Sequence, residues 1–398
     1  MTSSPTHIRP ALILGFAAFL AVSWTWCIGM FLPVLLVRDM GFGGWLIFAI
    51  PNVLGAAAMG WTLKTAGTSQ DLVASHRSAA IAFSLVTIAF HVFFVAWLIP
   101  RLLGPWGAWL TFIGAGCLLV LTCTPARRDV AFAVIILIVS TWAMFACLKQ
   151  GLKFDVPMTS PHTQLPDLLA LLPVCVFGFA LCPYLDLTFH RIRQYTTAPA
   201  ARLAFSIGFG VFFLLMIVFS LLYARLLAPI TAGPETNPLF RTLAPIIGFH
   251  MAIQSAFTLA VHLRELTIFF HPSTRHRWSP ILGATFMVPL VLVLWATTRP
   301  RLFGLDTGEV IYRCFLGFYG LVFPAYVYLC MIPFRLHLQS PSRWQVAVFA
   351  IVVLLAMPFF WVGFVQQYYL LLLPGLAIVL LARFASRSPA SSPVISRP

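Results

Sequence analysis

The chain has 398 residues, of which 61% are apolar and 9% charged, and its mean hydropathy is +0.95. A soluble domain cannot bury that much apolar surface, so we expect an all-α polytopic protein whose helices cross a lipid bilayer. The net charge of +15 comes from basic residues scattered between apolar runs, without a nucleic-acid-binding motif. It therefore indicates loops at the membrane surface and excludes nucleic acid as the expected partner.

Apolar runs of about 20 residues are long enough to span a bilayer. By that rule the sequence predicts twelve transmembrane helices, which in chain order are Ala11–Val37, Phe42–Leu63, Ala79–Ile99, Pro105–Thr124, Val130–Leu148, Leu168–Phe189, Leu203–Leu227, Leu243–Leu263, Pro280–Thr298, Val310–Phe334, Trp344–Phe364 and Tyr368–Phe384.

The basic residues between these runs predict the orientation. With the N-terminus inside, sixteen of the 25 Lys and Arg residues lie on the cytoplasmic side and nine on the other. Cytoplasmic loops carry the excess of positive charge, so we expect an inner-membrane protein with both termini in the cytoplasm.

We expect a single membrane domain divided along the chain. Its parts are a cytoplasmic N-terminus (1–10), a first five-helix repeat (11–148), an external loop (149–167), a second five-helix repeat (168–334), two additional helices (335–384) and a disordered Ser/Pro-rich cytoplasmic tail (385–398).

The first apolar run is too long for one straight span. Its 27 residues, "ALILGFAAFLAVSWTWCIGMFLPVLLV", would extend about 40 Å as a helix, against about 30 Å of hydrocarbon. Gly29 and Pro33 lie in its later half, and both residue types weaken a helix. We therefore predict an interruption at "IGMFLP".

The sixth run contains a second interruption, at "LCPYLD". Pro183 disfavours a helix at Cys182 and lacks an amide donor. Asp186 follows where a second short helix would begin, which suits an N-cap carboxylate. Alternatively, Asp186 binds a cationic group, accepts a proton, or lies at the interface in a local pair with His190.

One set of five spans begins at each interruption. Because five is odd, the second set enters the membrane upside down relative to the first. Interrupted helices at corresponding positions of two halves indicate an inverted-repeat transporter with a site between the breaks.

The two motifs resemble those of a known superfamily. "IGMFLP" is similar to the broken first helix of amino acid–polyamine–organocation transporters, and "FGFALCPYLD" resembles their sixth helix. The resemblance implies a LeuT-like fold with a 5+5 inverted repeat plus two helices. It also implies a secondary active transporter, such as an ion-coupled symporter, that moves an amino acid, amine or related small organic solute by alternating access. The substrate-binding residues it implies are Trp26, Cys27, Ile28, Gly29, Met30, Leu181, Cys182, Tyr184 and Asp186.

Polar residues of the eighth run lie on one helical stripe, His250, Gln254, Ser255 and Thr258. By the same resemblance, Ser255 and Thr258 would bind sodium together with Gly29. The alternatives are ordinary interhelical hydrogen bonds and coupling to a proton. We interpret His91, alone in the third run, as a satisfied packing residue.

The eight cysteines lack CxxC spacing, so we expect no metal site, no disulfide and no organic cofactor. One rival function is a membrane-embedded transferase for a lipid-linked substrate, using Asp39, Asp155, Asp167 and His162 on the outside. Others are a scaffold or sensor without transport, and a transporter with two six-span halves. The matched breaks favour the five-plus-five arrangement and a protein that is not an enzyme. The sequence does not indicate an oligomeric state.

Overall fold

The computed structural model describes residues 9–123, 128–158, 165–232, 237–269, 275–332 and 340–386. Over these residues, nine helices are long and apolar enough to cross a membrane, and three shorter apolar helices accompany them. Each of the twelve predicted runs is mainly helical where it is described. The prediction of an all-helical membrane protein is therefore confirmed.

The first set of helices contains a reversal inside one continuous element. The set comprises α1 (Pro10–Trp24), α2 (Cys27–Thr62), α3 (Ala66–Ser75), α4 (Arg77–Leu103), α5 (Trp106–Cys123) and α6 (Arg128–Lys149). Within α2, Gly41 has a φ of +68°, a backbone conformation that is strained for any residue with a side chain. A Cβ on Gly44 would lie 2.8 Å from the carbonyl oxygen of Leu36, so the two halves of α2 fold back on each other.

The second set is interrupted more often. It comprises α7 (Leu165–Leu181), the 3₁₀ turn η1 (Cys182–Leu185), α8 (Leu187–Tyr195), α9 (Ala198–Ile207), the π-helical η2 (Gly208–Phe213), α10 (Leu214–Leu227), α11 (Pro229–Ala232), α12 (Leu239–Phe269), α13 (Arg275–Thr298), the hairpin β1 (Arg301–Leu302) and β2 (Leu305–Asp306), α14 (Thr307–Gly317), π-helical η4 (Phe318–Val322), α15 (Phe323–Tyr326) and π-helical η5 (Val327–Met331). The last helices are α16 (Arg343–Phe364), the 3₁₀ turn η6 (Tyr369–Leu371) and α17 (Leu372–Ser386).

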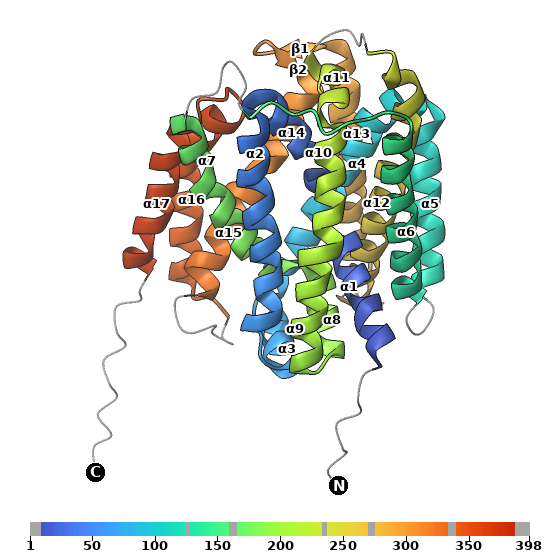
Figure 1. Cartoon of the computed structure of the whole chain (residues 1–398). Coiled ribbons are helices and arrows are strands. Elements are labelled where there is room, and N and C mark those ends of the chain that lie inside the picture. The colour runs from blue at the N-terminus through green and yellow to red at the C-terminus, as the bar shows by residue number, and fades with distance from the viewer. Residues whose placement is uncertain are drawn as a thin grey trace, which may run out of the picture.

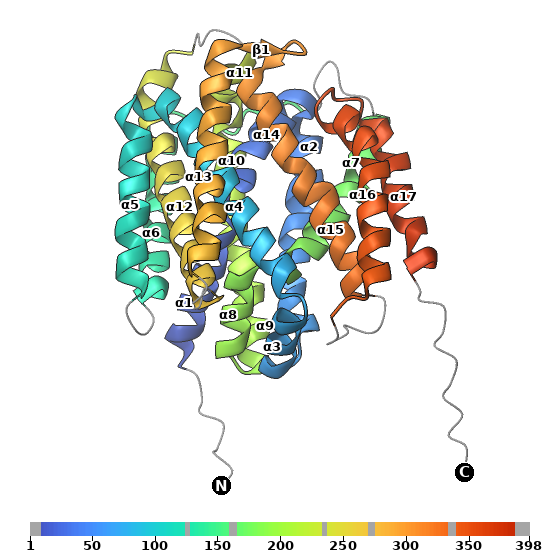
Figure 2. The same ribbon diagram turned by 180° about the vertical axis from the view of Figure 1, so that it is seen from behind.

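The two sets run in opposite directions (Figure 1). Helix α1 begins at the lower face of the bundle, whereas α7 begins at the upper face. Helices α3, α8 and α9 lie at the lower face, and α11 with the β1–β2 hairpin lies at the upper face, as the reverse view in Figure 2 also shows. Helices α16 and α17 pack against each other at one side, beside α7. This is the LeuT-like arrangement that the sequence predicts.

Small residues bring the central helices into close contact. A Cβ on Gly55 of α2 would clash with the backbone of Phe179 in α7, and one on Gly178 of α7 would lie 2.8 Å from the carbonyl oxygen of Tyr319 in η4. Helix α13, in contrast, buries little of its surface. The glycines thus allow α2, α7 and η4 to surround the centre of the bundle.

The close contact at Gly55 predicts a specific sensitivity to one added methyl group. Gly55→Ala should destabilise the protein by about 1–3 kcal/mol, because overpacking against a backbone carbonyl cannot be relieved by a side-chain rotation. Gly116→Ala in α5 is the matched control, since nothing lies within 4 Å of its Cβ position. Thermal unfolding in detergent should show a lower melting temperature for the first variant only. Equal melting temperatures for both variants would contradict the packing.

Candidate functional site

The break in the first span lies before the predicted motif. Helix α1 ends at Trp24 and α2 begins at Cys27, so Thr25 and Trp26 form the break. The prediction that Gly29 and Pro33 interrupt the span is therefore wrong, because both residues lie within α2.

The break lies at Thr25 and Trp26 because their side chains compete with backbone amides for the carbonyl oxygens of α1. The hydroxyl of Thr25 donates to the carbonyl oxygen of Ala21 at 2.8 Å, and the indole of Trp26 donates to the carbonyl oxygen of Ser23. Such local bonds offer the backbone an alternative to the helix ladder. The signal in the sequence was "SWTW", a polar interruption of an apolar run.

Side chains of three other helices form hydrogen bonds with the backbone at this break. The amide of Cys27 donates to Nε2 of His91 in α4 at 3.3 Å, and its carbonyl accepts from the hydroxyl of Tyr312 in α14 at 3.0 Å. The carbonyl of Met30 accepts from the hydroxyl of Tyr223 in α10 at 2.7 Å. His91 is therefore a satisfied buried residue, but one that holds the break rather than one that only fills space.

The second break lies at the predicted position. Helix α7 ends at Leu181, and after η1 the helix resumes as α8 with Asp186 as its N-cap. Oδ1 of Asp186 accepts from the amide and from the hydroxyl of Thr188, each at 2.7 Å, while Oδ2 has no partner among the described residues. The hydroxyl of Thr188 lies 3.4 Å from that of Ser23, so the two breaks are adjacent.

The proposed local pair between Asp186 and His190 does not form. Nδ1 of His190 is 2.7 Å from the hydroxyl of Ser69 in α3, and its Nε2 is 2.9 Å from the carbonyl oxygen of Tyr184. His190 therefore joins α8 to α3, and the observed role of Asp186 is to cap α8.

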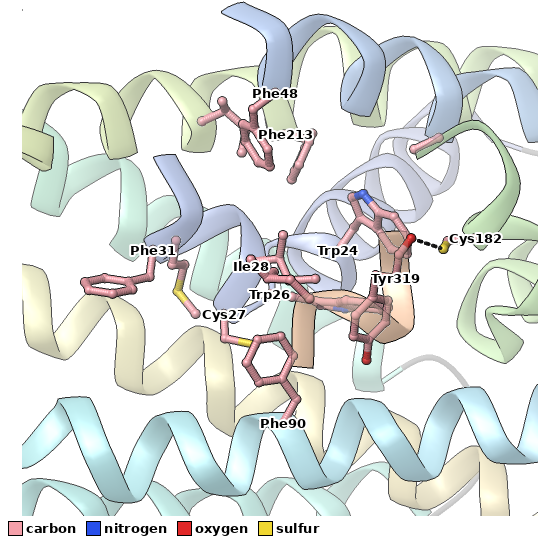
Figure 3. Close-up of a cluster of buried hydrophobic side chains, with 14 of the residues drawn as sticks. Trp24, Trp26, Cys27, Ile28, Phe31, Phe48, Phe90, Cys182, Phe213 and Tyr319 are labelled. Carbon is pink, nitrogen blue, oxygen red and sulfur yellow. Dashed lines mark hydrogen bonds between the residues drawn. The ribbon is translucent and has the colours of Figure 1, made fainter. Parts of the chain in front are cut away.

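A small cavity lies between the two breaks. Measured as the space open to the centre of a water molecule, its volume is about 20 Å³, which is room for one water. Its lining is mostly aromatic, and Figure 3 shows several of these side chains converging; the lining residues are Trp24, Trp26, Ile28, Gly29, Asn52, Phe179, Cys182 and Tyr319.

The cavity includes only part of the predicted substrate site. Trp26, Ile28, Gly29 and Cys182 line it, whereas the other predicted residues do not. Cys27 and Met30 use their backbone groups elsewhere, Asp186 caps α8, the hydroxyl of Tyr184 lies 2.6 Å from that of Thr62, and Leu181 ends α7.

Asn52 is one of the lining residues that sequence reasoning missed. Its Oδ1 accepts from the indole of Trp24 at 2.7 Å. Tyr319 was also missed; its ring centroid lies 5.5 Å from that of Trp26, and its carbonyl oxygen accepts from the thiol of Cys182 at 3.4 Å (Figure 3). A polar amide inside the apolar run "AIPNVLGAAAMG" was the available signal for Asn52.

A network of four ionised side chains closes the upper side of the site. Arg38 binds Glu309 through two hydrogen bonds of 2.7 Å, and Arg313 binds Glu309 at 2.8 Å. Asp39 accepts from Arg38 at 2.7 Å and from Arg313 at 2.6 Å. This upper network (Arg38, Asp39, Glu309, Arg313) joins α2 to α14.

An apolar path runs from this network to the central cavity. A second cavity of about 60 Å³ lies between α2, α7 and α14 and reaches Arg313 and Tyr369 at its upper end. It shares Ile28, Phe179 and Tyr319 with the central cavity. The remaining lining between these ends consists mainly of aliphatic side chains.

A corresponding network closes the lower side. Arg264 of α12 binds Asp129 of α6 at 2.6 Å and Glu265 at 2.9 Å, and Arg191 of α8 binds Glu265 at 2.5 Å. This lower network (Asp129, Arg191, Arg264, Glu265) joins α12 to α6 and α8.

The predicted sodium ligands do not share a hydrogen-bond network. The hydroxyl of Ser255 is fully buried without a partner among the described residues, and that of Thr258 donates to the carbonyl of Gln254 in its own helix. Gly29 packs against Phe213 and Ile217 instead. The sodium site remains a prediction.

No protein-family model and no curated protein matches the sequence. Among solved structures, it is similar to a manganese transporter of Eremococcus coleocola in complex with an aromatic bis-isothiourea substituted compound, with 14% identity, coverage of 96% of this chain and 95% of that one, and a TM-score of 0.49. It is also similar to the inward facing conformation of Mhp1, with 11% identity, coverage of 97% and 94%, and a TM-score of 0.40. At these values the LeuT-like description rests on the helix order and the two breaks.

The role of His91 at the first break predicts a matched pair of variants. His91→Phe should destabilise the protein by about 1–3 kcal/mol, because the buried amide of Cys27 loses its acceptor. His91→Gln retains a side-chain acceptor and should recover most of that loss. Thermal unfolding of both variants in detergent tests this expectation. Equal destabilisation by Phe and Gln would show that packing, and not the hydrogen bond, is what His91 provides.

Proposed function

We propose that the chain is a secondary active transporter that carries a small organic solute across the membrane by alternating access. The observation that carries this proposal is the meeting of two interrupted helices at a central cavity. Half-helices that end at mid-membrane supply both a site and movable parts, which is the usual construction of such transporters.

The two ion-pair networks support the same mechanism. The upper network holds the half of α2 that follows the first break, and the lower network holds α8, which follows the second. We infer that the two networks act as the gates of such a transporter, one on each side of the central cavity. Opening either side requires the ion pairs of that network to separate. A buried charge that loses its partner is costly, so each side chain must then contact water or a new partner.

The lining of the site favours an organic solute over a metal ion. Manganese is suited to carboxylate, carbonyl and water ligands, whereas this lining consists of aromatic rings, one thiol and one amide. We therefore do not propose manganese as the substrate of this chain.

The transferase alternative receives little support from the acidic residues that it would use. Asp39 is held by two arginines, and Asp155 pairs with Arg225 at 2.6 Å on the surface. His162 lies outside the described residues. We accordingly propose a transporter and not an enzyme, located in the inner membrane with both termini cytoplasmic and the upper network facing outward.

Alternating access predicts that Cys182 becomes reachable from one side at a time. In a variant that retains Cys182 as its only cysteine, Glu309→Gln should raise the rate of labelling by a membrane-impermeant thiol reagent from the outer face at least tenfold, because it breaks the upper network. Arg264→Gln should raise labelling from the cytoplasmic face instead.

Arg225→Gln is the control for the labelling experiment, since it removes an exposed ion pair of the upper side without touching the upper network. It should leave the rate unchanged. Simultaneous labelling from both faces would indicate a channel, and unchanged labelling in all three variants would argue against a transport site at Cys182.

We propose sodium as the coupling ion, with a proton as the alternative. The unpartnered hydroxyl of Ser255 is the observation in its favour. Sodium that binds the folded protein should raise its melting temperature relative to potassium, by mass action. Ser255→Ala should remove that difference, while Thr285→Ala on the exposed part of α13 should not. A protein whose stability is the same in sodium and potassium would contradict sodium coupling.

A further inference from the structure

The amide group of Asn52 has a fixed orientation. Its side chain is buried in α2 and accepts a hydrogen bond of 2.7 Å from the indole nitrogen of Trp24. An indole N–H can only donate, so the oxygen of the amide must face Trp24 and the nitrogen must point elsewhere.

The amide nitrogen of Asn52 is a hydrogen-bond donor without a partner among the described residues, although the residue is only 2% exposed. Asn52 lines the central cavity between the two breaks. An unpaired buried donor is costly unless an acceptor reaches it. The cavity therefore presents two hydrogens to whatever enters it.

The rest of the lining offers rings and no ionised group. Trp24, Trp26, Phe179 and Tyr319 supply aromatic surface, and the ring centroids of the two tryptophans are 4.4 Å apart. The thiol of Cys182 already donates a hydrogen bond to the carbonyl oxygen of Tyr319.

The path above the cavity is equally poor in charge. Between the central cavity and Arg313 at the upper end, it is lined by residues such as Leu32, Val174 and Leu316. A charged solute would lose its water along this path and meet no ionised side chain in the lining of the central cavity, because Asp186 lies outside that lining and caps α8.

We infer that the solute is an uncharged aromatic compound with a hydrogen-bond acceptor, such as a carbonyl group. It binds the amide nitrogen of Asn52 while its ring packs against the tryptophans, in a state where the surrounding helices have moved apart beyond the present room for one water. This inference rests on the proposed transport function and narrows its substrate class. Amines and carboxylates of the same size are poor ligands of this site, and Asn52 is the residue that determines the preference.

Three ligands with one ring and different charge test the inference. Benzamide is neutral and carries a carbonyl, benzoate is an anion and benzylammonium is a cation. Binding to the purified full-length protein at pH 7.5, measured by isothermal titration calorimetry, should be at least tenfold tighter for benzamide than for either ion. Equal or tighter binding of an ion, or binding of none of the three, would overturn the inference.

Two substitutions at Asn52 separate its hydrogen bond from its volume. Asn52→Asp keeps an acceptor for Trp24 but replaces the donor by a carboxylate oxygen, so benzylammonium should become the preferred ligand. Asn52→Leu retains the approximate size of the side chain. It should weaken the binding of benzamide about tenfold without strengthening the binding of benzylammonium. Thr285→Ala on α13, outside the lining, is the control and should keep the native order.

The result is separable from that of the transport proposal. If Asn52→Asp and Asn52→Leu bind benzamide as the native protein does, Asn52 does not determine the preference and the inference fails. Opposite-sided labelling of Cys182 in the Glu309→Gln and Arg264→Gln variants would then still support alternating access at this site.

Discussion

The absence of hydrogen-bonding partners in lipid constrains this structure more than any other factor. A helix that stops at mid-membrane exposes backbone groups, and each must be satisfied by protein. At the first break, His91 accepts from the amide of Cys27, and Tyr312 and Tyr223 donate further hydrogen bonds to the carbonyl oxygens of Cys27 and Met30. These side chains come from α4, α14 and α10, so one interruption fixes how three distant helices pack around the centre.

The breaks and the ion-pair networks form one mechanical arrangement. An uninterrupted helix would transmit any tilt at one end to the other, whereas a broken helix allows its halves to move separately. Arg38 and Asp39 lie on the half of the first broken span above its break, and Arg191 lies on the half of the second below its break. Each network therefore holds a part that the neighbouring break leaves free to move, and the glycine contacts between α2, α7 and η4 keep the remaining helices in place.

The sequence predicted those features whose causes are local. Pro183 and Asp186 act within a few residues, so the second break and its cap were placed correctly. Gly29 and Pro33 were misjudged, because a helix packed among others tolerates both residues. The site depends on long-range contacts that one sequence does not reveal: the bond between Arg38 and Glu309 joins residues 271 positions apart. Asn52 was visible as a polar residue, but its pairing with Trp24 was not.

The use of Asp186 also limits the chemistry of the centre. A carboxylate at a helix break suggests a binding site for a cation, yet this one caps α8 through the amide and hydroxyl of Thr188 and does not line the cavity. The carboxyl group stabilises the second half-helix, and under the proposed transport function the selectivity at the centre depends on an amide and aromatic rings. A site that must hydrogen-bond its ligand rejects analogues without the matching group far more strongly than it discriminates by size, because its own buried group is then left unpaired. For this reason a single neutral side chain, Asn52, can determine which solutes the site accepts.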